Sequence, residues 1–66
     1  MSLTMAYINS CEYHASDGRI IKREYGITPN GNKIEGAWVL RDAKGTWLDF
    51  DQYRHDLAGR NNLSVP

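Results

Sequence analysis

Apolar and polar positions alternate along much of the chain, and three short polar segments interrupt this pattern. The interrupting segments are 16–18 (Ser-Asp-Gly), 29–32 (Pro-Asn-Gly-Asn) and 43–45 (Ala-Lys-Gly). Each combines residue types that form tight turns. Runs rich in β-branched and aromatic residues lie around them, near 6–14, 19–28, 33–41 and 46–50. Such spacing is typical of hairpins in series and predicts a four-stranded antiparallel β-meander.

Two of the turns also predict which residues face each other. A type I turn at 42–45 with a left-handed Gly45 places Asp42 opposite Thr46. The pairs that follow from the two turns are Leu40–Leu48, Trp38–Phe50, Thr28–Lys33, Ile27–Ile34, Tyr25–Gly36, Arg23–Trp38 and Ile21–Leu40. Both turns therefore place the bulky apolar residues on one face of the sheet.

The first hairpin allows two registers. A three-residue loop at 16–18 places Tyr13 opposite Ile21 and Tyr7 opposite Ile27. A tighter turn at Asp17-Gly18 would place Glu12 opposite Arg23 instead. We favour the first, because it buries two tyrosines and Cys11.

After residue 50 the apolar period becomes helical. Phe50, Tyr53 and Leu57 are spaced i, i+3 and i+7, and Gly59 is a natural residue just beyond a helix end. A helix is therefore expected near 51–58, capped by Asp49 or Asp51 and packed on one sheet face. Residues 60–66 are polar and are expected to fray.

The whole chain, 1–66, is thus expected to be a single small α+β domain, a four-stranded meander with one C-terminal helix. A helix of two turns cannot cover four strands. The alternatives are that the sheet curls into a small SH3-like barrel, or that a second copy covers the remainder.

Composition excludes several classes of protein. Among 66 residues, eight Lys and Arg balance eight Asp and Glu, and there is one cysteine. No disulfide framework is possible, and no His/Cys cluster predicts a metal site. Because no apolar run resembles a leader or a membrane span, we expect a cytoplasmic protein without membrane contact.

Candidate chemistry is sparse. Asp51 and His55 share a helix face and could form a general base with an orienting carboxylate. An exposed histidine near a helix end is the simpler explanation. Cys11 and His14 point to opposite faces of a strand and cannot share a metal. We therefore predict no catalytic residue, no cofactor and no metal ligand. Arg23, expected on the core face, is predicted to stack on Trp38 and to reach the helix. The alternative is that Arg23 binds an anion or a partner.

The face of the sheet away from the helix carries one anomaly, an exposed tryptophan. The predicted partner-binding residues gather around it: Trp47, Arg41, Val39, Lys22 and Ile20. Exposed Trp and Arg beside aliphatic residues are typical of protein interfaces. A cation–π pair that shields the hairpin would explain the same pattern. The sequence thus favours a non-enzymatic regulatory or accessory module that binds a protein partner or itself, as a homodimer.

A nucleic-acid-binding sheet is the alternative function. The open face combines three cations with four anions: Lys22, Lys33 and Arg41 against Glu12, Glu24, Glu35 and Asp49. Phosphate contacts dominate nucleic-acid affinity, so this balance disfavours the alternative.

Overall fold

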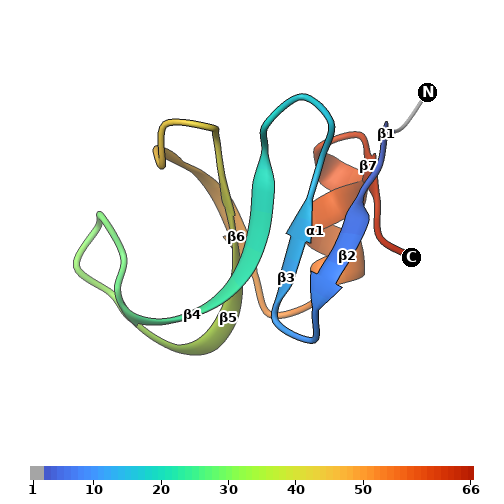
Figure 1. The fold of residues 1–66 in the computed structure, drawn as a ribbon. Helices are drawn as coiled ribbons and strands as arrows, with labels where there is room; N and C mark the ends of the chain where they lie inside the picture. The colour runs from blue at the N-terminus through green and yellow to red at the C-terminus, as the bar shows by residue number, and fades with distance from the viewer. Residues whose placement is uncertain (1–2) are drawn as a thin grey trace.

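The structure is a computed structural model that describes residues 3–66. Its elements in chain order are β1 (Leu3–Thr4), β2 (Ala6–Asn9), β3 (Glu12–His14), β4 (Ile20–Ile27), β5 (Lys33–Arg41), β6 (Trp47–Asp51), α1 (Arg54–Arg60) and β7 (Leu63–Ser64). Strands β2 to β6 form an antiparallel sheet in sequence order, and β1 pairs with β7 in parallel (Figure 1). The predicted α+β architecture, a meander followed by a short helix, is confirmed.

The meander has five strands because the segment predicted as one strand, 6–14, folds back on itself. Asn9 Oδ1 accepts a hydrogen bond from the Cys11 backbone N–H at 2.8 Å, which closes a side-chain turn. Tyr7 therefore pairs with Tyr13 and not, as predicted, with Ile27. The pairing of Tyr13 with Ile21 agrees with the predicted three-residue loop.

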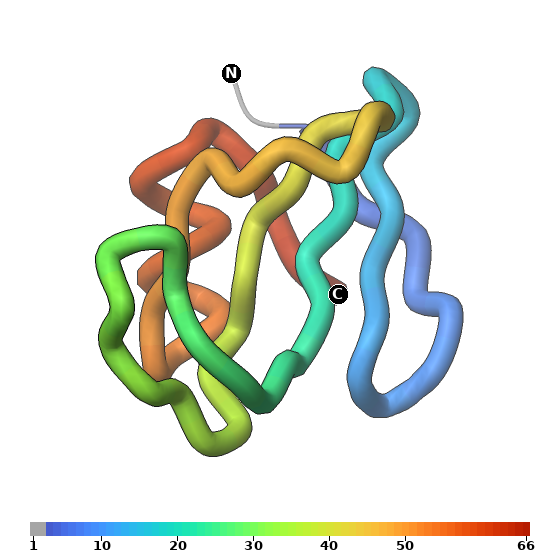
Figure 2. Tube along the Cα trace, turned by 90° about the vertical axis from the view of Figure 1, so that its left-hand side faces the viewer, coloured from blue at the N-terminus to red at the C-terminus, as the bar shows by residue number. Residues whose placement is uncertain are grey.

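The sheet is open and does not form the SH3-like barrel considered as an alternative. Its outer strands, β2 and β6, are not hydrogen-bonded to each other. The long β4–β5 hairpin nevertheless curls strongly, so that its turn approaches β6 (Figures 1 and 2). One face of the sheet is consequently concave, and α1 lies on the other side.

The main core lies between the sheet and α1. It consists of Met5, Tyr13, Ala15, Ile21, Trp38, Leu40, Leu57, Ala58 and Leu63, with Val65 packed against it. Trp38, Leu40 and Leu57 belong to this core as predicted. Leu48, Phe50 and Tyr53, predicted to join them, are exposed instead.

Residues 60–66, expected to fray, include the short strand β7. Leu63 is only 3% exposed and pairs with Leu3, so β7 closes the core beside α1. Met5 N–H donates to the Ser64 carbonyl at 2.8 Å and extends this contact. Burial of one leucine thus holds a segment whose composition looks like a tail.

The helix begins later than predicted, at Arg54 and not near residue 51. Asp51 still pairs with Trp38 as the last residue of β6, and its carboxylate accepts the Tyr53 N–H at 2.9 Å. Tyr53 is the N-cap and makes no side-chain capping bond. In the described residues no helix is long and apolar enough to cross a membrane.

A bulge displaces the register of the β5–β6 hairpin by one residue. Arg41 faces Trp47, as the turn predicted, but Leu40 faces Asp49 and Val39 faces Phe50. The predicted pairs Leu40–Leu48 and Trp38–Phe50 are therefore wrong. Since side chains alternate between faces, the slip moves Phe50 to the concave face and Asp49 to the helix side.

A second bulge shifts the far end of the β4–β5 hairpin. Ile21 faces Leu40 and Arg23 faces Trp38 as predicted, whereas Tyr25 faces Glu35. The predicted pairs Tyr25–Gly36, Ile27–Ile34 and Thr28–Lys33 do not form; Ile27 faces Lys33. Gly36, with φ +80°, provides the left-handed residue that such a bulge favours.

Candidate binding surface

The concave face has an apolar cluster of its own. Ile34, Ala37 and Val39 are buried there, and Trp47 packs against them. The Trp47 and Phe50 rings meet edge to face with centroids 5.5 Å apart. Both faces of β5 are thus buried over residues 37–40, each by a separate set of side chains.

A cleft opens beside this cluster, between the β4–β5 turn and β6. It comprises two open depressions of about 460 and 280 Å³ that share Phe50. The first is lined by Lys33, Ile34, Glu35, Ala37, Phe50 and Gln52, and the second by Thr28, Pro29, Asn30, Trp47, Leu48, Asp49 and Phe50. We refer to the two together as the Phe50 cleft.

Large apolar side chains are exposed in the Phe50 cleft, and a hydrogen bond fixes the turn on its opposite wall. Phe50 is 41% exposed and Leu48 is 49% exposed. On the opposite wall Thr28 is buried, and its hydroxyl accepts the Asn32 N–H at 3.0 Å, which fixes the turn. The surface is therefore held in shape by the fold.

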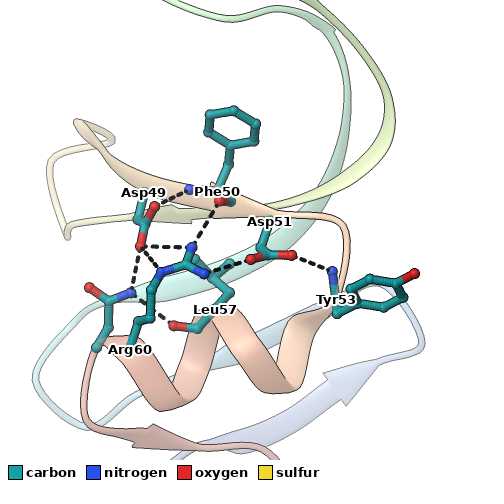
Figure 3. A network of polar contacts seen from close by, with 7 residues as sticks. Asp49, Phe50, Asp51, Tyr53, Leu57 and Arg60 are labelled. Atoms are coloured by element: carbon teal, nitrogen blue, oxygen red, sulfur yellow. Dashed lines mark hydrogen bonds and ion pairs between the residues drawn. The ribbon is translucent and has the colours of Figure 1, made fainter.

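A network at the end of α1 directs Phe50 outward (Figure 3). Arg60 donates to Asp51 at 2.6 Å, to Asp49 at 3.2 Å and to the Phe50 carbonyl at 3.1 Å. Asn61 Nδ2 donates to Asp49 at 3.0 Å. The aspartates on either side of Phe50 thus face the helix, and the Phe50 ring points away from it.

The same network shifts the ionisation of both carboxyl groups. The Arg60 hydrogen bond is the main reason that the pKa of Asp51 is lowered. Burial alone would raise the pKa of Asp49, but hydrogen bonds from Asn61, the Phe50 N–H and Arg60 lower it overall. Both groups are therefore held as carboxylates.

Arg41 is neutralised on the concave face. Its guanidinium donates to both oxygens of Glu24, at 2.8 and 2.9 Å, and to the Gly45 carbonyl at 2.7 Å. The hydrogen bond from Arg41 is the main cause of the lowered pKa of Glu24. Arg41 Cζ also lies 5.5 Å from the Trp47 ring centroid, which is the shielding contact considered from the sequence.

The five predicted partner-binding residues share the concave face but differ in accessibility. Val39 is 0% exposed and cannot touch a partner in this conformation, whereas Trp47 is half-buried. Ile20, Lys22 and Arg41 border a separate depression of about 410 Å³, together with the acidic residues Glu12 and Glu24. The larger apolar exposure lies along β6, at residues that the predicted register placed in the core.

Arg54 takes the place predicted for Arg23. Its Cζ lies 5.3 Å from the Tyr13 ring centroid and 5.5 Å from that of Trp38, and its Nε is buried without a hydrogen-bond partner. Arg23 is exposed and bonds the Gly36 carbonyl at 3.2 Å. The predicted stacking of Arg23 on Trp38 is therefore wrong, and Arg54 of α1 makes this contact instead.

The remaining candidate side chains do not assemble into a reactive group. Asp51, expected beside His55, is bound by Arg60, and His55 is exposed. His14 Nε2 lies 2.6 Å from Glu12, and Cys11 is an exposed free thiol. Within residues 3–66, no group of three or more His, Cys, Asp or Glu could hold a metal ion.

The sequence did not indicate that Leu48 and Phe50 are exposed, because a hairpin without a bulge would place both in the core. One signal was available, the alternation of two aspartates with apolar residues in Trp47–Asp51 followed by Arg60. Buried carboxylates need partners, so the aspartates belong on the side where an arginine is available. Comparisons with protein-family models, curated proteins and solved structures found no match for this chain.

Proposed function

We propose that this chain is a small non-enzymatic module that binds a protein partner through the Phe50 cleft. The observation that carries the proposal is the exposure of Phe50 and Leu48 beside Trp47, on a surface backed by a second buried cluster. Aromatic anchors at a supported apolar surface are the usual centre of a protein interface. Trp47, named from the sequence, remains part of this surface.

Charge around the cleft favours an uncharged apolar segment of the partner. Arg41 is paired with Glu24, and Lys33 lies 3.0 Å from Glu35. These pairs leave little net charge for steering a charged ligand. The partner would therefore gain affinity mainly from apolar burial.

The partner would dock by its side chains and not by adding a strand at Phe50. The Phe50 N–H donates to the Asp49 carboxylate at 2.8 Å, and the Phe50 carbonyl accepts from Arg60. Both backbone groups are therefore already satisfied at this point of the sheet edge. The depressions on either side of the Phe50 ring would receive two side chains of the partner.

Selection of peptides from a random displayed library against the wild-type protein tests the proposal. Phe50→Ala should weaken binding of the selected peptides on the order of tenfold or more, because truncating an anchor typically costs at least about 1.4 kcal/mol. Tyr25→Ala is the matched control, since Tyr25 is 71% exposed and does not line the cleft. Calorimetry measures the affinities.

Two results would contradict the proposal: selected peptides that bind Phe50→Ala as tightly as wild type, or weakening by Tyr25→Ala alone. Nucleic-acid binding remains the disfavoured alternative. Salt-sensitive binding of duplex DNA that Lys22→Glu abolishes would support that alternative and replace the module proposed here.

A further inference from the structure

The two edges of the five-stranded sheet differ. Strand β6 is protected by charged side chains, since Asp49 and Arg60 occupy the backbone groups of Phe50. Strand β2 has no such protection: all four residues, Ala6–Asn9, are exposed, and none carries a charge. Proteins commonly place charges on edge strands to prevent pairing with other chains.

The backbone of Tyr7 faces away from the sheet. Arg23 N–H donates to the Cys11 carbonyl and Ala15 N–H donates to the Arg19 carbonyl, so the odd-numbered residues of this segment bond towards β4. Backbone N–H and C=O groups alternate in direction along a strand, so those of His14 and its partner Ala6 point into the β2–β3 ladder. Tyr7, the next residue, presents its N–H and C=O to the open edge.

A row of aromatic rings ends at the same residue. The Trp38 and Tyr13 ring centroids are 6.1 Å apart, and those of Tyr13 and Tyr7 are 5.7 Å apart. Trp38 and Tyr13 are buried in the main core, whereas Tyr7 is 61% exposed. The row runs from β5 through β3 to β2 and stops at an exposed ring.

We propose that β2 pairs with β2 of a second copy of this chain, antiparallel and with Tyr7 at the two-fold axis. In such an isologous contact the residue at the axis faces its own counterpart, and like charges there would repel. An uncharged strand meets this condition. The two Tyr7 residues exchange their free N–H and C=O groups, and their rings continue the aromatic row into the partner.

The bulge at Ile8 restricts this pairing to a short segment. The β2 register shifts between Tyr7 and Asn9, and the Met5 N–H is already bonded to the Ser64 carbonyl, so the pairing is confined to the edge around Tyr7. The interface is accordingly small, and the dimer is a reversible one that forms with rising concentration. It uses a surface different from the Phe50 cleft, so the two proposals can fail independently.

A charge-swap experiment tests the two-fold arrangement. Sedimentation equilibrium is measured on the wild type, on Tyr7→Lys, on Tyr7→Glu and on an equimolar mixture of the two variants. We expect the mass of two chains for the wild type at high concentration, of one chain for each variant alone, and of two chains for the mixture. Opposite charges face each other only if Tyr7 meets Tyr7 of the other copy.

Tyr25→Lys is the control, because it adds the same charge at an exposed tyrosine remote from β2 and should stay dimeric. A monomeric wild type, or a variant at Tyr7 that dimerises alone, would overturn the proposal. Monomeric variants whose mixture stays monomeric would overturn the Tyr7 axis. Restored association in the mixture also shows that both variants are folded.

Discussion

Arg54 makes the aromatic contact that the sequence predicted for Arg23. Arg54 stacks between Tyr13 and Trp38, while Arg23 lies across Gly36 at the rim. A Cβ atom at Gly36 would come within 2.9 Å of Arg23 Nε. Gly36 therefore makes room for the Arg23 guanidinium group.

Gly36→Ala should destabilise the fold. The Arg23 side chain can move aside, but the left-handed backbone at φ +80° costs an alanine roughly 1–2 kcal/mol. Gly59→Ala is the matched control: Gly59 is helical, nothing lies within 4 Å of its added Cβ, and the change should stabilise by roughly 0.5–1 kcal/mol. Urea unfolding of both variants measures the difference, and equal effects would contradict this account of Gly36.

At the scale of elements, β6 is defined by its bulge and by Arg60. The sequence allowed the strand, the turn and the pairing of Arg41 with Trp47 to be predicted, because these depend on local turn chemistry. It did not reveal the slip beyond Leu48, which depends on a helix-borne arginine that bonds Asp49 and Asp51. Long-range pairing, which hydrophobic alternation does not encode, decided which face Phe50 occupies.

The same limit applies to other elements. The meander and the helical stripe were predictable from turn residues and from the spacing of Tyr53 and Leu57. The split between β2 and β3 rests on one Asn9 side-chain bond, and the position of β7 rests on burial of Leu63. Neither signal stands out in a polar stretch.

The Arg60 network should make stability depend on pH. Folding lowers the pKa of Asp49 and Asp51 below their ordinary value of 3.8. The network therefore stabilises the fold above that value and loses its contribution as the pH falls through the folded pKa values. Arg60→Gln should reduce the loss of unfolding free energy between neutral pH and pH 3, measured by denaturant titration.

Lys44→Gln is the control for this comparison, because it removes the same charge from an exposed side chain. Its pH dependence should match that of the wild type. Glu12, Asp17 and Glu24 also have a lowered pKa, so part of the acid sensitivity should persist in Arg60→Gln. Unchanged acid sensitivity in Arg60→Gln would contradict the assigned role.

At the scale of the molecule, both faces of the sheet carry a buried apolar cluster, but α1 and β7 cover only one of them. The helix side is closed by α1 and β7, which gives the domain its core. The concave side has a smaller buried cluster and leaves Phe50 and Leu48 open. The proposed module function depends on this division, because the register predicted from the turns would hide the same side chains.

The central claim is therefore that Phe50 lies on the concave face. Nuclear Overhauser effects from the Phe50 ring protons in solution test it most directly. The structure predicts cross-peaks to the Trp47 ring, on the concave face, and none to Leu57 or Trp38, on the helix side. Strong cross-peaks from Phe50 to Leu57 and Trp38, with none to Trp47, would contradict the account.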